Sequence, residues 1–360
     1  MIMPYFLIVS FSFGQLLTLL GRTVRWSLLD VFALFVSVLW LIRFMRSRIR
    51  VFPKLFIAAA IFAVCAVAPR AGEAQELLYI GRWAAYAGIY AYVILDRHRI
   101  RWKMALYLSG FLLACLGLFQ LLTYPDLRNL MYLGWDPHYE RVFATLFDPN
   151  FAGILFVLTL LLGFSFWPLS KKRTWMLWST QAIVFVAFLL TYSRSAYLAF
   201  VAGIITWLWQ KRSYRLLIAV VSAFAVVILL LSGKGEGQNL FRQVSSQARV
   251  GSAVTGWNRF LSSPVFGTGF THTSESRAGG VDASLLYVLS SGGLVAFAAY
   301  GYLFWEIIIL GFSDVFFLSA IAALLINSLF INSLFYPWVM AWVWVIAALT
   351  ENRRPFKTGR

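Results

Sequence analysis

The sequence predicts an all-α membrane protein with about twelve transmembrane helices, and three observations support this prediction. Apolar segments run through almost the whole chain of 360 residues, of which 61% are hydrophobic and only 12% are charged. The gaps between these segments alternate between Arg/Lys-rich and Arg/Lys-poor, as the positive-inside rule requires. The 15 Trp and 16 Tyr suit the aromatic belts at the two membrane surfaces.

The charge alternation also predicts the orientation. Five gaps on alternate turns of the chain hold 19 of the 31 Lys and Arg, so these gaps and both termini are expected in the cytoplasm. Most of the net charge of +17 then lies beside anionic lipid headgroups, and no nucleic acid is expected as a partner. The Arg/Lys-rich gaps are 43–54, 97–103, 171–173, 211–215 and 353–360.

The individual spans follow from length, because a helix needs about 20 apolar residues to cross a bilayer. Several candidates are short, and two of them are joined only by Tyr192 to Ser195. The even number of spans depends on the charge alternation. The twelve expected spans are 4–20, 27–44, 51–68, 77–95, 104–122, 148–167, 176–192, 196–209, 216–232, 284–306, 315–332 and 335–350.

Two gaps on the outer side are long enough to hold structure, at 123–147 and 233–283. Within the second, 239–261 predicts an interfacial helix, with an apolar face opposite Arg242 and Arg249 at 100° per residue. We find no repeat or soluble domain, so 1–360 is expected to form a single transmembrane domain with 233–283 as its periplasmic or extracellular loop. The apolar face of the predicted helix 239–261 would consist of Leu240, Val244, Val250, Val254, Trp257 and Leu261.

The outer side carries most of the chemistry-bearing residues. The chain has no nucleotide-binding glycine loop, no His/Cys metal spacing and no Ser-His-Asp arrangement, so neither a cofactor nor a metal is expected. Eleven Arg and one Lys nevertheless lie on the Arg/Lys-poor side, and Arg offers a planar fork to phosphate oxygens. Arg82 lies inside a span, which indicates either a binding site or a buried ion pair. Arg194 lies at the apex of a tight hairpin of spans.

Four blocks of residues follow one another along 141–305. Arg141-Val-Phe-Ala-Thr-Leu-Phe-Asp-Pro-Asn150 opens a span, and Thr191-Tyr-Ser-Arg-Ser195 forms the hairpin. Arg249 and Trp257-Asn-Arg259 precede a Pro264–Phe270 turn, and Asp282-Ala-Ser284 opens the next span. The blocks resemble four signatures of the O-antigen ligase/polymerase superfamily. In chain order, these signatures are R-x-x-G-T-F-x-x-P-N, T-x-S-R-[GS], R…W…P-x-x-G-x-G-F and [HD]-N-S. The N-terminal spans match only in hydropathy.

The resemblance implies a metal-independent glycosyltransferase of the GT-C type in the cytoplasmic (inner) membrane, with 141–305 as its catalytic core. It would take a glycan from an undecaprenyl-diphosphate carrier on the periplasmic or outer side and pass it to a glycan or lipid-linked glycan acceptor. A chain-length regulator is a further expected partner, beside the lipid bilayer. The residues expected to bind the diphosphate and glycan are Arg82, Arg141, Asn150, Arg194, Arg249 and Arg259.

The expected base is Asp282, with His272 as the alternative. Ligases that attach glycan to lipid A-core carry His where this chain has Asp282, and an Asp there is closer to the polymerases. Either group can accept a proton from an acceptor hydroxyl. Asp282 could instead only cap the following helix, and His272 could be a plain loop histidine. We therefore predict polymerisation of repeat units into O-antigen, capsular polysaccharide or exopolysaccharide first, and O-antigen ligation second.

A flippase or transporter of lipid-linked glycans is the alternative from another class. Such a protein would need charged residues through the bilayer in both halves, and transporters commonly consist of repeated halves. Here the polar residues gather on one side of the membrane, which favours chemistry at the surface over passage.

Overall fold

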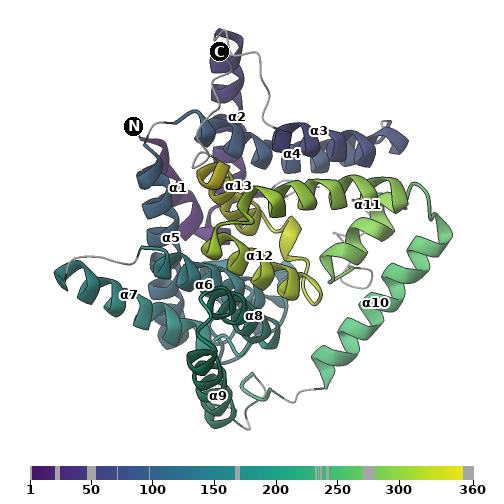
Figure 1. Cartoon of the computed structure of the whole chain (residues 1–360). Coiled ribbons are helices and arrows are strands. Elements are labelled where there is room, and N and C mark those ends of the chain that lie inside the picture. The colour runs from purple at the N-terminus through teal and green to yellow at the C-terminus, as the bar shows by residue number, and fades with distance from the viewer. Residues whose placement is uncertain are drawn as a thin grey trace. The chain divides into compact units, whose positions relative to one another are not determined.

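The computed structural model describes residues 2–20, 25–46, 54–70, 72–96, 98–166, 171–231, 233, 235, 237–240, 243–270 and 280–351. This part of the chain is mainly helical, with α-helices α1 to α13 (Figure 1), so the prediction of a mainly α-helical protein is confirmed. A two-stranded sheet of β1 (Thr18–Leu20) and β2 (Arg25–Ser27) was not predicted. The helices form two compact units. His272 and Arg242 lie outside the described residues.

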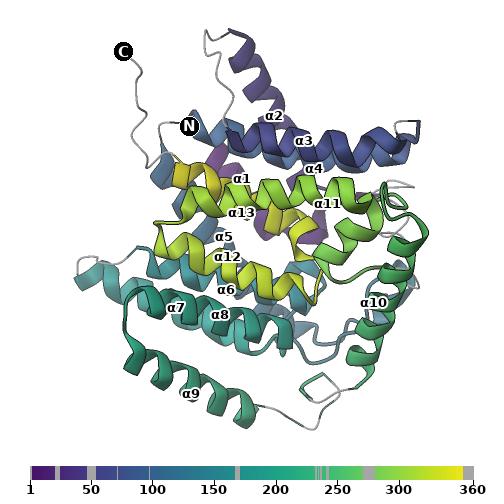
Figure 2. The same ribbon diagram turned by 45° about the vertical axis from the view of Figure 1, so that its right-hand side comes forward.

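The first unit contains Met1–Thr18, Met104–Gln243 and Ser313–Asn327. In it, α6 packs against both α7 and α8, and α8 packs against α9 (Figure 2). Because α6 is apolar on all sides, it is almost wholly buried and forms the core of this unit. The helices are α1 (Met3–Ser12), most of α5 (Arg99–Thr123), α6 (Pro149–Phe164), α7 (Lys171–Leu189), α8 (Arg194–Gln210), α9 (Tyr214–Leu231) and most of α12 (Val315–Ser328), with 3₁₀ turns η1 (Gly14–Leu17), η3 (Arg128–Leu133) and η4 (Ala144–Leu146).

The second unit contains Leu19–Lys103, Val244–Phe312 and Ser328–Arg360. Its central helix is α4, which packs against α2, α3 and α13, while α11 packs against α3 and α10. The elements are α2 (Leu28–Arg46), α3 (Lys54–Val67), α4 (Ala74–Ile94), α10 (Val244–Ser262), α11 (Ser284–Gly311) and α13 (Pro337–Glu351), with η2 (Ala68–Arg70) and η5 (Ser333–Phe335).

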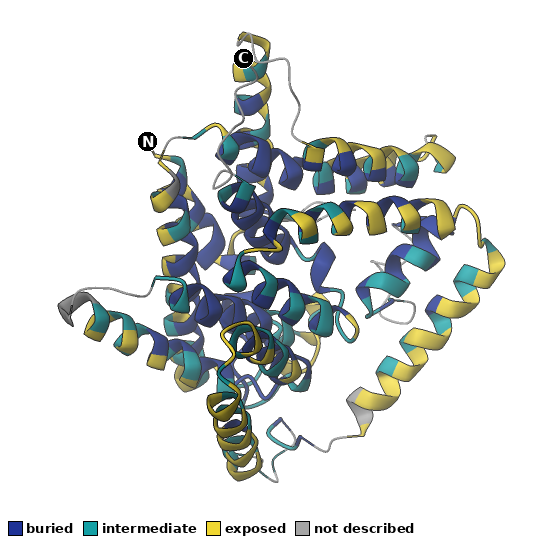
Figure 3. Cartoon of the chain, viewed as in Figure 1, coloured by how far each residue is buried: buried dark blue, intermediate teal, exposed yellow. Residues whose placement is uncertain are grey.

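Four of the described helices are long and apolar enough to cross a membrane, namely Leu28–Arg46, Ile100–Thr123, Tyr214–Leu231 and Ser284–Gly311. Shorter apolar helices accompany them, and every residue of α9 except Phe224 is exposed or half-buried (Figure 3). A long apolar helix without a protein neighbour on most of its faces is suited to lipid. The prediction of a helical membrane protein is therefore confirmed at this level. Each predicted span overlaps one of the described α-helices, and α10 is a further helix, but the number of twelve spans and the topology remain predictions.

The first predicted span, 4–20, differs most from the structure. Its helix α1 ends at Ser12, and the chain continues through η1 into β1. Gly14 adopts a positive φ of 54°, where it meets Thr145 so closely that a Cβ would lie 2.4 Å from the Thr145 hydroxyl oxygen. A ten-residue helix is only about 15 Å long, or half the hydrocarbon thickness. The contact with a distant segment ends the helix although the hydropathy continues.

The predicted interfacial helix 239–261 is present as α10, which begins later, at Val244. Its predicted apolar face is exposed at Val250, Val254, Trp257 and Leu261, whereas Arg249 is half-buried. Most of α10 is exposed or half-buried (Figure 3). The predicted helix and its exposed apolar stripe are therefore present, and its position along the outer leaflet remains a prediction.

Candidate functional site

In the first unit, Arg141 clamps the hairpin between α7 and α8. Arg141 is 5% exposed, and its Nε donates a hydrogen bond to the Thr191 carbonyl at 2.8 Å. Its Nη2 donates to the Tyr192 carbonyl at 3.3 Å, and the Val142 amide donates to the Leu190 carbonyl at 2.9 Å. The Arg141 guanidinium thus provides hydrogen-bond donors for two backbone carbonyls that follow the end of α7. The first and second motif blocks are thus joined by Arg141.

Asn150 contacts the same hairpin. The Ser193 hydroxyl donates to the Asn150 side-chain oxygen at 2.9 Å and lies 3.2 Å from the Ser195 hydroxyl. Ser193 is also the N-cap of α8, so its position determines where α8 begins. Arg194, the first residue of α8, is half-buried. The structure therefore brings Arg141 and Asn150 together on the hairpin that carries Arg194.

Two carboxylates and a histidine lie beside this hairpin. One ligand atom each from Asp136, His138 and Asp148 lie within 4.8 Å of one another, a group that could hold a metal ion. The Arg141 Nη1 lies 3.4 Å from His138 Nδ1, however, and a guanidinium at that distance disfavours a cation among the three side chains. We assign no metal to this group. His138, one of only three histidines in the chain, lies in no recognised motif and was not predicted from the sequence.

Asp148 is the N-cap of α6, immediately ahead of the first residue of that helix. Its Oδ1 accepts hydrogen bonds from the backbone amides of Asn150 at 2.6 Å and Phe151 at 3.4 Å. Asp148 therefore caps the start of α6.

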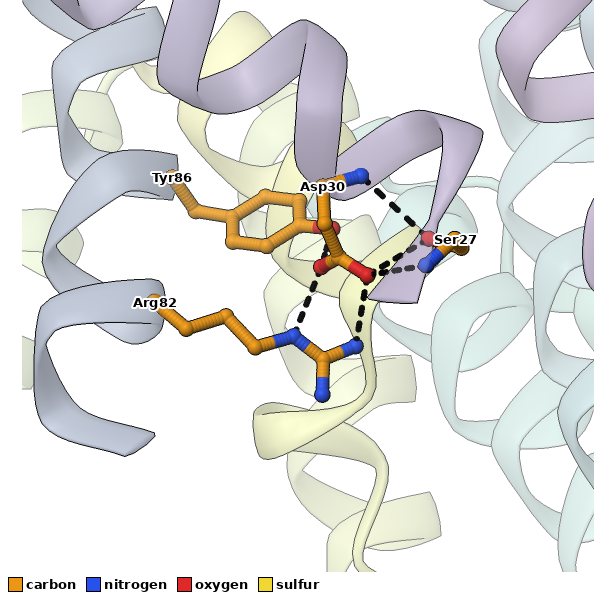
Figure 4. Close-up of polar contacts among 4 residues, drawn as sticks. All are labelled: Ser27, Asp30, Arg82 and Tyr86. Atoms are coloured by element: carbon orange, nitrogen blue, oxygen red, sulfur yellow. Dashed lines mark hydrogen bonds and ion pairs between the residues drawn. The ribbon is translucent and has the colours of Figure 1, made fainter. Parts of the chain in front are cut away.

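In the second unit, Arg82 forms a buried ion pair with Asp30. The Arg82 Nε and Nη2 donate to the two Asp30 oxygens at 2.7 and 2.9 Å (Figure 4). The Tyr86 hydroxyl donates to the same carboxylate at 2.7 Å, as do the amide and hydroxyl of Ser27, each at 2.7 Å. The Asp30 side chain has no exposed surface and that of Arg82 is 18% exposed. Five donors thus satisfy one buried carboxylate and join α2 to α4.

The third Arg82 nitrogen points away from Asp30 in Figure 4. A cavity of about 20 Å³ is lined by Arg82, Tyr79, Trp83, Phe335 and Met340. That volume accommodates about one water molecule, and a phosphate group is larger. Of the two interpretations that the sequence left open for Arg82, this geometry supports the ion pair.

The Pro264–Phe270 turn is built into a break in α11. Gly293 has φ 63° and ψ −167°, so α11 consists of two helical halves. The amides of Thr268 and Gly269 donate to the Ser290 and Ser291 carbonyls at 3.0 and 2.8 Å. In return, the amides after the break, of Leu294 and Val295, donate to Pro264 and Val265 carbonyls at 2.9 and 3.3 Å. The turn therefore completes the hydrogen bonding that the break leaves open.

Residues near the start of α4 hold the other side of this turn. Glu76 is fully buried, and its carboxylate accepts a hydrogen bond from the Phe270 amide at 2.9 Å. The Tyr287 hydroxyl donates to the Phe270 carbonyl at 2.8 Å, and Arg70 Nη2 donates to the Gly267 carbonyl at 2.9 Å. Glu76 was not predicted from the sequence, because it lies in no motif and its partner is 194 positions away.

Asp282 lies directly before α11, whose N-cap position is occupied by Ala283. Ala283 makes no side-chain capping bond, so the alternative role of Asp282 as the N-cap of this helix does not match the structure. The Asp282 amide donates to the Ser252 hydroxyl of α10 at 2.8 Å. Arg249, on the same helix, places its guanidinium 5.9 Å from the ring centre of Phe330.

The predicted site residues are therefore divided between the two units. Arg141, Asn150 and Arg194 share the hairpin of the first unit, while Arg249, Arg259 and Asp282 belong to α10 and the segment before α11 in the second. Arg82 is paired with Asp30. The convergence of Arg82, Arg141, Arg194 and Arg249 on one diphosphate remains a prediction.

The long apolar helices and this arrangement of polar residues define a multi-pass helical membrane protein. The family model described as O-antigen ligase matches residues 180–301, about a third of the chain. Over these residues, the match confirms the predicted resemblance to the O-antigen ligase/polymerase superfamily, and it implies a glycosyltransferase-like enzyme in general. The matched segment contains Arg194, Arg249, Arg259 and Asp282, and the Arg141–Asn150 block precedes it. No curated protein matches the chain.

Proposed function

We propose that the protein polymerises undecaprenyl-diphosphate-linked repeat units on the outer side of the cytoplasmic membrane. Twelve spans with both termini in the cytoplasm would place the hairpin of Arg194 and the 233–283 loop on that side. The observation that carries the choice of polymerisation is Asp282, which stands where ligases of the superfamily have His. The match to the O-antigen ligase family supports glycosyl transfer in general.

The proposed chemistry needs a stabilised leaving group and a base. As the bond between the anomeric carbon and the phosphate oxygen breaks, negative charge grows on the diphosphate, and guanidinium groups stabilise it without a metal. We assign this contact to Arg194 and Arg249, with Arg259 as a further donor. Asp282 accepts the proton of the acceptor hydroxyl while the new glycosidic bond forms. A carboxylate has an ordinary pKa near 4 and is ionised at neutral pH.

Arg141 and Asn150 have a more indirect role in this proposal. Both are held by the 191–193 hairpin, so they fix the position of Arg194 at the start of α8. Asn150 keeps its amide nitrogen for a sugar or phosphate oxygen, since its side-chain oxygen is the atom bonded to Ser193. For Arg82 we favour the ion pair with Asp30, which holds α2 and α4 together, over direct contact with the diphosphate.

The second candidate is O-antigen ligation to lipid A-core. The description of the matched family as O-antigen ligase favours it. In that case His272 would be the base, as a histidine in the same outer loop.

Purified protein in proteoliposomes with an undecaprenyl-diphosphate-linked oligosaccharide distinguishes the two reactions. A polymerase produces a ladder of longer lipid-linked glycans from this donor alone, whereas a ligase requires lipid A-core as well. Asp282→Asn should lower the rate of polymer formation by about 10²- to 10⁴-fold, because the amide cannot take the proton. Normal polymer from Asp282→Asn together with an inactive His272→Ala variant would transfer the base to His272 and favour the ligase.

A further inference from the structure

The hydroxyl of Ser252 holds the backbone on both sides of Val281. It accepts a hydrogen bond from the Asp282 amide at 2.8 Å and donates one to the Gly280 carbonyl at 3.1 Å. A serine hydroxyl has one proton to donate, so this arrangement uses its donor and one of its acceptor positions at once. The segment that enters α11 is thereby attached to α10 at two points.

The helix that carries Ser252 is seated closely against the beginning of α11. A Cβ at Gly256 would lie 2.9 Å from the Leu286 side chain and 3.0 Å from that of Val281, so this position has no room for a larger residue. Ser252 and Gly256 are four residues apart and share one face of α10. This face of α10 therefore packs closely against residues 280–286, which keeps the two segments at a fixed separation.

The same face of α10 includes the two arginines of the proposed site. At about 100° per residue, Arg249, Ser252, Gly256 and Arg259 lie within about 80° of one another around the helix axis. The exposed apolar residues of α10, such as Trp257, lie on another side. The hydrogen bond that the Asp282 amide donates to Ser252 thus fixes the proposed base relative to the helix that presents Arg249 and Arg259.

We infer that Ser252 is a positioning residue for the glycosyl transfer: its hydroxyl holds the backbone of Asp282 in register with the arginine face of α10. This inference rests on the proposed function of Asp282 as the base. Ser252 itself touches no reacting atom. Its removal should lower kcat without a matching change in the KM for the lipid-linked donor, because the arginines stay in place while the base moves.

The contact itself is tested by hydrogen–deuterium exchange of the peptide spanning residues 280–286 in purified, detergent-solubilised protein. Ser252→Ala removes both bonds, so the Asp282 amide should exchange at least about 10-fold faster, whereas Ser252→Thr keeps the hydroxyl and should restore the slow exchange. Ser246→Ala, at an exposed position of α10, is the matched control and should leave this peptide unchanged. Exchange in Ser252→Ala that equals the wild type would overturn the contact.

The catalytic consequence is tested by polymer formation in proteoliposomes. We expect kcat of Ser252→Ala to fall about 10- to 100-fold, since a displacement of about 1 Å can cost about 100-fold, with KM within about twofold of the wild type. Ser252→Thr should recover most of the rate. Faster exchange with a wild-type kcat, or a loss that Ser252→Thr does not recover, contradicts the positioning role. If Ser252→Ala does not fold, Ser252→Cys keeps the volume, weakens both bonds and takes its place.

Asp282→Asn separates this inference from the proposed function. If that variant keeps full activity, the base assignment fails and no kinetic role through Asp282 is left for Ser252, while the exchange experiment still reports whether the contact exists. If Asp282→Asn is inactive and Ser252→Ala is fully active, the proposed function stands and the inference fails.

Discussion

Removing one charge of the Asp30–Arg82 pair should strongly destabilise the second unit. In Asp30→Asn, the Arg82 guanidinium keeps its charge but loses the two carboxylate oxygens at 2.7 and 2.9 Å. In Arg82→Gln, a carboxylate without exposed surface keeps only the donors of Tyr86 and Ser27. Each single variant therefore leaves an uncompensated charge among packed helices.

The size of the effect follows from this burial. Breaking a buried ion pair by removing one partner costs about 3–5 kcal/mol, and we expect Asp30→Asn near the lower end because Arg82 is partly exposed. Removing both charges leaves two amides that can bond to each other. The double variant should thus recover at least about 2 kcal/mol relative to the sum of the single variants. Ser37→Ala, which removes a neutral bond from α2 to the Ala85 carbonyl of α4, should cost only about 1 kcal/mol.

Equilibrium unfolding in mixed micelles, followed by tryptophan fluorescence, measures these free energies, and polymer formation is measured on the same preparations. Additive single variants would show that the two charges do not depend on each other. An Arg82→Gln variant with wild-type stability and no product would refute the ion-pair interpretation and return Arg82 to the substrate site.

The remaining predictions concern the arginines and the topology. Arg194→Lys and Arg249→Lys keep the charge but lose the planar fork, so each should reduce polymer formation by about 10²- to 10³-fold at equal expression; wild-type polymer from both would exclude direct recognition of the diphosphate. In intact cells, with the outer membrane permeabilised if there is one, an impermeant thiol reagent should label a cysteine placed at position 238 and not one at 172; the reverse result would invert the topology.

Except for α10, which was predicted from its amphipathic pattern, the described α-helices were predictable because each lies in an apolar run, and hydropathy alone gives approximate limits for most of them. The end of α1 at Ser12 was not predictable in this way, since the apolar run continues beyond it to residue 20. Gly14 stops the helix through a contact with Thr145, a residue 131 positions later. Likewise, the Gly-Gly pair at 292–293 lay within a predicted span without indicating that α11 is broken there. Contacts between distant segments decide both cases.

Among the site residues, Arg141 and Asn150 were expected from their motif to bind substrate, which remains a prediction, and the structure shows that both bind the 191–193 hairpin. Asp30 was missed, yet its signal was present: a carboxylate in one predicted span and Arg82 in another are each costly alone and stable as a pair. Glu76 and Ser252 gave no comparable signal. Their partners are backbone amides 194 and 30 positions away, and a backbone amide has no sequence signature.

The break in α11 explains why the Pro264–Phe270 turn and the beginning of α11 must form together. In an apolar environment every backbone polar group needs a partner, because no water is available to replace it. The break at Gly293 opens the carbonyls of Ser290 and Ser291 and the two amides that follow it, and the turn supplies a partner for all four. The first half of α11 is thus fixed at its end by the turn and at its beginning by Ser252 and α10. A short half-helix held at both ends has little freedom to rotate, so the backbone of Asp282, two residues before its first residue, is fixed as well.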